Sequence, residues 1–148
     1  MADTERSSKC ASSLRPALRC LAGLGFILAG ANHFRSTVFY KSIIPPAFPS
    51  PYLLVIISGI AEMAGGIGLF IPRLRRSAGR GLIALLIAVF PANIYMAITP
   101  DSIGAAGFAH WMLWLRLPLQ VVFIVWVWFA AGPEISPRRR KGRRANSN

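Results

Sequence analysis

Polar side chains that could exchange protons or bind a ligand occur inside segments that are otherwise apolar. The clearest example is Glu62, near the centre of the apolar stretch 52–71. An ionisable side chain inside a bilayer costs about 2.5–3.5 kcal/mol on insertion scales, so it usually has a polar partner or a function. Arg116, inside another apolar stretch, is the candidate partner. Either the two form a structural ion pair that locks the helices together, or they belong to a ligand or proton site.

Four further polar residues are predicted to join this pair. Asn32 and His33 lie near the end of the first apolar stretch, Asn93 lies in the third, and Gln120 lies one helical turn after Arg116. At a rise of about 1.5 Å per residue, these side chains lie at depths in the bilayer close enough to that of Glu62 for contact. The sequence therefore predicts a polar cluster in the outer half of a helix bundle, made of Asn32, His33, Glu62, Asn93, Arg116 and Gln120.

The chemistry that this cluster could perform is restricted by the residue types. His33 and His110 could bind a metal ion or haem, but two histidines without a third ligand make a weak signal. The arginine, glutamine and asparagine donors could bind the carbonyl oxygens of a quinone while Glu62 takes protons, although they suit other small solutes as well. Neither a Ser-His-Asp constellation nor a redox pair is readable, because Cys10 and Cys20 lack the CxxC spacing.

The elements that position these residues are predicted to be membrane-spanning helices. Of the 148 residues, 54% are hydrophobic and only 15% are charged, which is typical of a membrane bundle and not of a water-soluble domain. Four apolar segments each have about the 20 residues that a bilayer core requires. Prolines end or separate most of them. The predicted spans are 14–34, 52–71, 78–98 and 110–131.

The second span has a face of small residues around Glu62. Ser58, Gly59, Gly65 and Gly66 lie three or four positions away from the glutamate and so share its side of a helix. Small residues allow membrane helices to approach closely. We therefore expect this face to be buried in protein and not in lipid.

Prolines accompany the polar residues of the third and fourth spans. Pro91 precedes Asn93, and Pro118 lies between Arg116 and Gln120. A proline has no N–H to bond to the carbonyl group four residues earlier. We expect each of these helices to bend and each freed carbonyl group to find a polar partner.

Basic residues are distributed unequally around the four spans. The N-terminal flank and the second loop contain four each and the C-terminal tail contains six, whereas the first loop contains two and the third none. Because Lys and Arg accumulate on the cytoplasmic side, both termini are predicted to be cytoplasmic, in a multi-pass protein of the cell membrane. The formal charge of +12 then reflects topology and contact of the tail with anionic lipid, and not nucleic-acid binding.

The chain is predicted to contain one all-α domain, a polytopic membrane four-helix bundle. Residues 1–13 form a basic flank, 14–131 the transmembrane domain, and 132–148 a basic tail that we expect to be disordered. The first segment also resembles a cleaved signal peptide, with Ala29-Gly30-Ala31 as the cleavage site. We favour a retained span, because basic residues reach Arg19 and the segment continues into Asn32 and His33.

Five motifs, in order along the chain, resemble the DoxX-like family of small four-helix membrane proteins. They are AGANHF at 29–34, SIIPPAFPSP at 42–51, SGIAEMAGGIGLFIPR at 58–73, FPANIYMA at 90–97 and LWLRLPLQ at 113–120. The resemblance covers about residues 14–131 and implies a four-helix bundle in the lipid bilayer. The six cluster residues named above match polar positions of these motifs, which have no agreed catalytic role in the family.

The resemblance also implies a function. Some members of that family are membrane subunits of thiosulfate:quinone oxidoreductase or partners of thiol- and superoxide-handling enzymes, while most have no assigned activity. Since this chain lacks a cysteine pair, haem ligation and a flavin fingerprint, we expect an accessory subunit or anchor for a membrane or soluble oxidoreductase, and no catalysis by the chain alone. The sequence specifies no cofactor, and a quinone is the one that the resemblance leaves open. The alternatives are a small-solute or proton-coupled carrier that uses Glu62, and a structural or assembly factor.

The predicted orientation can be tested with single cysteines. Cysteines introduced at Ser42 and Ser102, in the first and third loops, should react with a membrane-impermeant thiol reagent in intact cells, because both loops are predicted to lie outside. A cysteine at Ser77, in the basic second loop, should react only after the membrane is opened. Reaction in intact cells at Ser77 alone would contradict the assignment.

Overall fold

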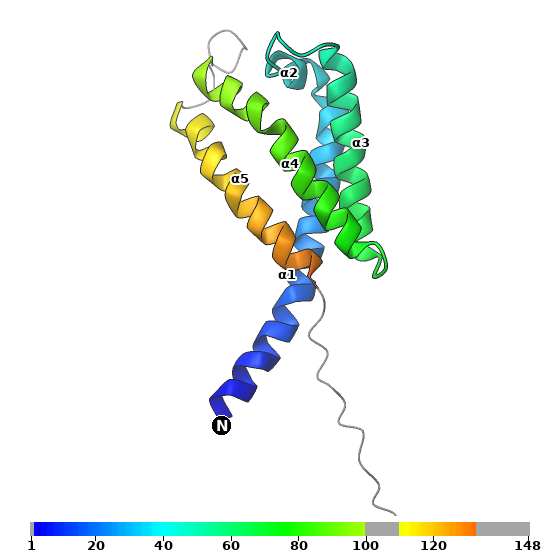
Figure 1. Ribbon diagram of the computed structural model, residues 1–148, viewed down its shortest axis with the longest axis vertical. Coiled ribbons are helices and arrows are strands. Elements are labelled where there is room, and N and C mark those ends of the chain that lie inside the picture. Colours follow the sequence, from blue (N-terminus) through cyan, green and yellow to red (C-terminus); the bar gives the residue numbers. More distant parts are fainter. Residues whose placement is uncertain (1, 100–109, 133–148) are drawn as a thin grey trace, which may run out of the picture.

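The chain folds into helices, four of which are long enough to cross a membrane. A computed structural model describes residues 2–99 and 110–132, with side chains for 14–99 and 111–132. Its elements are α1 (Ala2–Arg35), α2 (Thr37–Ser42), α3 (Pro51–Phe70), α4 (Arg75–Ile98) and α5 (His110–Ala131), shown in Figure 1. The membrane-length apolar segments are Leu14–Arg35, Pro51–Phe70, Arg75–Ile98 and Trp111–Ala131. The protein is thus an all-α, multi-pass membrane protein, and the predicted fold class is confirmed.

Helix boundaries differ from the predictions by more than one residue in three places. α1 extends back to Ala2, so the backbone of the basic flank is helical, consistent with its content of Ala, Glu, Lys and Arg. The first loop contains the short helix α2, which ends before the prolines that follow it. α4 begins at Arg75 instead of Ala78. Outside the described residues lie the predicted third loop from 100 to 109, the tail from Pro133, and the side chains of Cys10 and His110.

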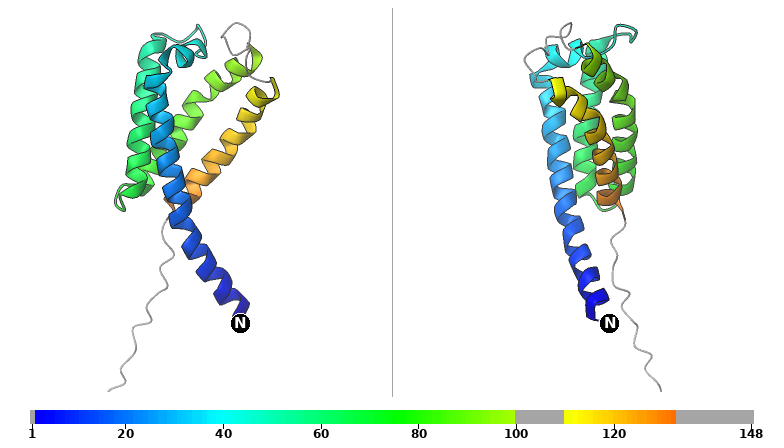
Figure 2. Two further views of the ribbon diagram at one scale, coloured as in Figure 1. Left: turned by 180° about the vertical axis from the view of Figure 1, so that it is seen from behind. Right: turned by 90° about the vertical axis from the view of Figure 1, so that its left-hand side faces the viewer.

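The four long helices form two pairs, α1 with α3 and α4 with α5. α3 also packs against α4, and α1 packs against α5. Figures 1 and 2 show that the two pairs meet at one end and diverge toward the other, where α2 lies. We call the first the basic end, which contains the 71–74 turn between α3 and α4, and the second the α2 end. The bundle is therefore a wedge.

Glycines bring α1 and α3 into backbone contact. A Cβ atom added at Gly30 would lie 2.6 Å from the carbonyl oxygen of Gly59, and one added at Gly66 would lie 2.7 Å from that of Gly23. Neither position has room for a side chain, so the two helix backbones pack directly on each other. Gly59, Glu62 and Gly66 are buried. The prediction that the small-residue face is buried in protein is confirmed.

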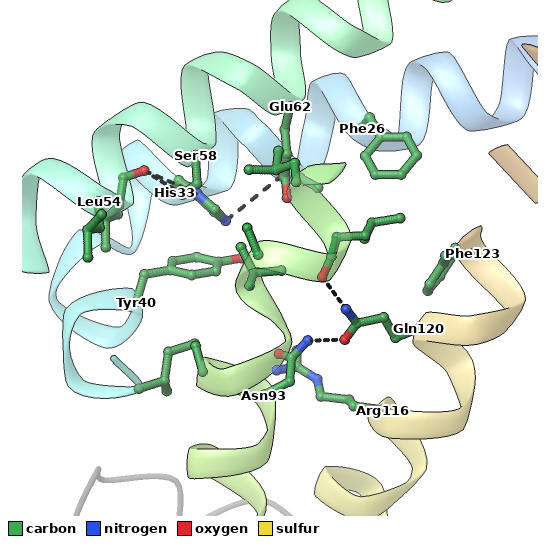
Figure 3. A pocket seen from close by; sticks show the side chains of 18 of the residues that line it. Phe26, His33, Tyr40, Leu54, Ser58, Glu62, Asn93, Arg116, Gln120 and Phe123 are labelled. Atoms are coloured by element: carbon green, nitrogen blue, oxygen red, sulfur yellow. Dashed lines mark hydrogen bonds and ion pairs between the residues drawn. The ribbon is translucent and has the colours of Figure 1, made fainter. Parts of the chain in front are cut away.

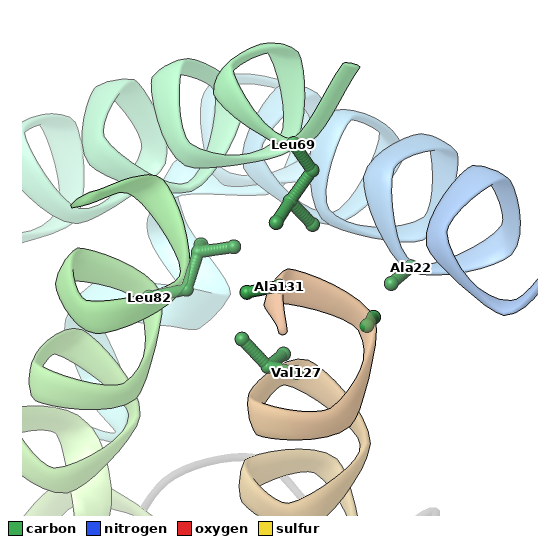
Figure 4. Close-up of a cluster of buried hydrophobic side chains, with 6 residues drawn as sticks. Ala22, Leu69, Leu82, Val127 and Ala131 are labelled. Atoms are coloured by element: carbon green, nitrogen blue, oxygen red, sulfur yellow. The ribbon is translucent and has the colours of Figure 1, made fainter. Parts of the chain in front are cut away.

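At the basic end, α1 is joined to α5 through backbone carbonyl groups. Arg19 Nε donates to the Ala130 carbonyl oxygen at 3.0 Å, and Trp126 Nε1 donates to the Leu18 carbonyl oxygen at 3.1 Å. All four long helices contribute to the buried apolar cluster beside these contacts (Figure 4). Its members are Ala22, Leu69, Leu82, Val127, Ala130 and Ala131. This end of the wedge is closed by packing.

A second apolar cluster lies at the α2 end and consists of Ile43, Met96, Ala97 and Leu113. Ile43 follows α2, whereas the other three residues belong to α4 and α5. Phe39 and Tyr40 of α2 pack against the same cluster. The α2 segment therefore bridges from α1 and α3 to the diverging pair. Between the two clusters lies a cavity.

Candidate functional site

The cavity has a volume of about 750 Å³ and is lined by α1, α3, α4, α5 and the α2 segment. This volume falls within the range of about 300–1,000 Å³ that is typical of small-molecule pockets. Most of the lining side chains are apolar. Hydrogen-bonding side chains from both helix pairs also reach it. Figure 3 shows His33, Tyr40, Ser58, Glu62, Asn93, Arg116 and Gln120, and Trp126 also lines the cavity.

One wall, formed by α1 and α3, contains a carboxyl oxygen without a hydrogen-bond partner. Glu62 is only 8% exposed, because its face of α3 packs toward α1. Its Oε2 lies 3.9 Å from His33 Nε2, which is too long for a hydrogen bond. The same oxygen is buried and accepts no hydrogen bond from the part of the chain that the structure describes. Leaving such a group unsatisfied costs about 1–3 kcal/mol or more, so this atom marks a place where a proton or a donor group would bind.

The imidazole of His33 is held through its other nitrogen. His33 Nδ1 lies 3.0 Å from Ser58 Oγ and 3.3 Å from the Val55 carbonyl oxygen. Since a carbonyl oxygen can only accept, Nδ1 of the neutral ring carries the proton and Nε2 is left as an acceptor. The Tyr40 ring lies 3.9 Å from the His33 ring, centroid to centroid. Glu62 Oε2 and His33 Nε2 are then two acceptors that face each other, and a donor between them would satisfy both.

The opposite wall, formed by α4 and α5, holds linked carboxamide groups. Asn93 Nδ2 donates to Gln120 Oε1 at 2.7 Å, and Gln120 Nε2 donates to the Leu86 carbonyl oxygen. Gln120 is 3% exposed. Leu86 directly precedes Ile87. The Ile87 carbonyl group has no intrahelical donor, because the residue four positions later is Pro91, which lacks an N–H. Polar support for the proline-containing part of α4 therefore comes from α5, and it is directed to Leu86.

Arg116 belongs to the same wall, and its predicted ion pair with Glu62 is wrong. Arg116 Nη1 donates to Met96 Sδ at 3.4 Å, a weak acceptor. Among the described side chains, the ionisable group close to Glu62 Oε2 is the His33 imidazole, at 3.9 Å. The reason is the arrangement of the helices, because α3 and α5 belong to different pairs and the cavity lies between them. The guanidinium group and the carboxyl group thus line one cavity from two sides.

The structure brings five of the six predicted cluster residues to the cavity. The exception is Asn32, an exposed residue whose Nδ2 donates to the Tyr40 hydroxyl oxygen at 3.2 Å. Tyr40 and Ser58 line the cavity but were not predicted as site residues. The spacing of Ser58, four residues before Glu62, could have identified it. The sequence gives no comparable signal for Tyr40, because α2 was expected to be a loop.

The described residues contain no group of three or more His, Cys, Asp or Glu side chains that could hold a metal ion. Cys20, the cysteine whose side chain is described, is exposed. The cavity therefore provides acceptors on one wall and a cationic donor on the other, separated by apolar surface. Such an arrangement suits a small, mostly apolar molecule with polar atoms at two positions.

The two walls predict different energetic couplings. Glu62→Gln and Arg116→Leu should change the free energy of unfolding in detergent additively, to within about 0.5 kcal/mol, because the side chains lie on opposite walls. Glu62→Gln and His33→Leu should deviate from additivity by about 0.5–3 kcal/mol, because the side chains are neighbours. Both cycles can be measured by denaturant titration. A larger coupling for Glu62 with Arg116 than with His33 would contradict the observed arrangement.

One comparison with known proteins identifies a family. The family model described as "Domain of unknown function (DUF8561)" matches residues 21–131. Neither the curated proteins nor the solved structures contain a match to the chain. The matched segment begins within α1, ends with α5 and contains every cavity residue discussed above. The chain therefore belongs to the family defined by this domain of unknown function, DUF8561.

Proposed function

We propose that the protein is an accessory membrane subunit that holds a lipid-soluble quinone in the cavity and serves an oxidoreductase partner. The proposal rests on one observation. An unsatisfied carboxyl oxygen, Glu62 Oε2, and the guanidinium group of Arg116 line opposite walls of a mostly apolar cavity. The motif resemblance to DoxX-like proteins supports the same proposal, and we propose that the chain is a distant member of that group.

The chemistry of the two walls fits the two oxygen atoms of a quinone ring. Arg116 can donate a charge-assisted hydrogen bond to one oxygen. The second oxygen would lie beside Glu62 and His33, where a protonated carboxyl group donates to a carbonyl and a carboxylate accepts from a hydroxyl. Conversion of a quinone to a quinol consumes two electrons and two protons. The partner supplies the two electrons, Glu62 exchanges one proton with the ring oxygen beside it, and water supplies the second proton to the oxygen that Arg116 binds.

The apolar lining accounts for the remainder of the ligand. Phe26 of α1 and Phe123 of α5 line the cavity and lie together on one side of the polar residues in Figure 3. Aromatic and aliphatic side chains provide the contact surface for a ring and its substituents, while a few polar groups fix orientation. The cavity provides both kinds of surface.

We further propose that the bundle lies in the cell membrane with both termini in the cytoplasm. The distribution of basic residues supports this orientation. It would place the α2 end and the polar walls in the outer half of the bilayer. The basic tail would then contact anionic lipid on the cytoplasmic side.

A proton-coupled carrier of a small solute is a second candidate. The buried, unpartnered oxygen of Glu62 favours it, because an intramembrane carboxyl group is a common element of proton relays. In that case solute uptake into proteoliposomes would depend on a pH gradient and on Glu62, and quinone would not bind.

Quinone binding can be measured by quenching of tryptophan fluorescence, since Trp126 lines the cavity. Decylubiquinone added to the protein in phosphatidylcholine nanodiscs should give a saturable quenching component. Glu62→Leu and Arg116→Leu should each raise its Kd about tenfold or more, because each removes a hydrogen-bonding group, worth about 1.5–3 kcal/mol where it is charged.

Two variants serve as controls for this measurement. Arg73→Leu removes an exposed arginine outside the cavity and should leave the Kd unchanged. Trp126→Phe should remove most of the saturable component, whereas Trp128→Phe, at a side chain that is 70% exposed, should keep it. Quenching that never saturates would overturn the proposal, and solute-coupled proton uptake would then support the carrier.

A further inference from the structure

We infer that the cavity opens sideways into the bilayer between α1 and α5, and that its ligand is a membrane-dissolved amphiphile that enters ring first and leaves an apolar tail in this opening. The inference rests on the proposed function and adds the route and the class of molecule. We call the opening the α1–α5 portal and define it by Gly25 and Ala29 of α1 and by Leu119 and Phe123 of α5.

Both ends of the cavity are packed, so access along the bundle axis is obstructed. At the basic end the buried cluster around Leu69 and Leu82 joins all four long helices. At the α2 end, Ile43 packs with Met96 and Leu113 across the diverging helices. A ligand must then reach the polar walls from the side of the bundle, where lipid surrounds the protein.

The helices α1 and α5 diverge beyond their contacts at the basic end (Figure 2). Those contacts join Arg19 to Ala130 and Leu18 to Trp126, in the last two turns or so of α5. Beyond them the two helices separate, as the left view of Figure 2 shows. The cavity, which lies between the pairs, borders this gap.

The portal residues both line the cavity and remain exposed, as residues at an opening must. Leu119 is 39% exposed and Phe123 is 40% exposed, and Gly25 and Ala29 are also exposed. A Cβ atom added at Gly25 would meet no atom within 4 Å. At Gly25, α1 therefore has no side chain that obstructs the space beside it.

The polarity of the route fixes the class of ligand. All four portal residues are apolar. By contrast, the side chains of Gln120 on α5 and Glu62 on α3 are polar and buried. Apolar surface at the opening and hydrogen-bonding groups inside match a molecule with a polar ring and a hydrocarbon tail. On the opposite flank, the close approach of α3 and α4 lies at the basic end, where a Cβ atom added at Gly68 would lie 2.7 Å from Ala78 Cβ.

A pair of glycine substitutions tests the portal. Gly25→Phe fills the opening, and Gly81→Phe is the matched control, because Gly81 is also an exposed helical glycine with no atom within 4 Å of an added Cβ. Gly81 does not line the cavity. In stopped-flow quenching by decylubiquinone, Gly25→Phe should slow association about tenfold or more, while Gly81→Phe stays within about twofold of the unmodified protein.

A photoreactive probe locates the tail independently of the variants. A benzoquinone whose decyl tail ends in a diazirine should crosslink the unmodified protein at α1 and α5, near the portal residues. Crosslinks confined to Leu54 and Ile57, exposed cavity residues of α3, would overturn the portal, as would equal association rates for both glycine variants. In either case saturable binding by the unmodified protein would leave the proposed function standing. Absence of that binding would overturn both proposals.

Discussion

The close contact between the backbones of α1 and α3 is the constraint on which the rest of the structure depends. It requires glycine at both crossing points, and it also sets the site, because a Cβ atom added at Gly59 would lie only 2.9 Å from His33 Cβ. The contact that stabilises this helix pair therefore seats the imidazole beside the Glu62 carboxyl group. In lipid, where apolar side chains gain nothing by leaving solvent, such packing is a main source of helix association. Among the described residues, the α4–α5 pair has no equivalent backbone contact with α1 and α3 at the cavity, so it can diverge from them.

The two walls of the cavity differ in how well their polar groups are satisfied. On the α4–α5 wall, Asn93 and Gln120 bond to each other and to a backbone carbonyl group, so these two carboxamides need no ligand, whereas Arg116 donates to the weak acceptor Met96 Sδ. On the α1–α3 wall, Glu62 Oε2 faces the acceptor side of His33 and has no donor among the described residues. A buried group left unsatisfied in an otherwise well-bonded structure is more readily explained by function than by packing. This asymmetry directs attention to the acidic wall as the place where chemistry occurs.

The sequence predicted the helices well and their neighbours poorly, for physical reasons. Bilayer thickness fixes the length of a span, so apolar runs and prolines identified all four, and the glycines around Glu62 revealed a buried face. Depth along the membrane, however, does not say which helices are adjacent, and the ion pair with Arg116 was inferred from depth alone. Consecutive residues of a helix also point about 100° apart. Of Asn32 and His33, only His33 can therefore face the cavity, and the sequence could not say which.

The central claim is that the cavity binds one lipid-soluble molecule between its acidic and cationic walls. Native mass spectrometry of the protein purified in mild detergent, with chemical analysis of the released lipid fraction, tests it most directly. We expect one quinone per chain in the unmodified protein and none in the double variant Glu62→Gln, Arg116→Leu. Purified protein that retains only bulk phospholipid, or a quinone that binds equally to the double variant, would contradict it.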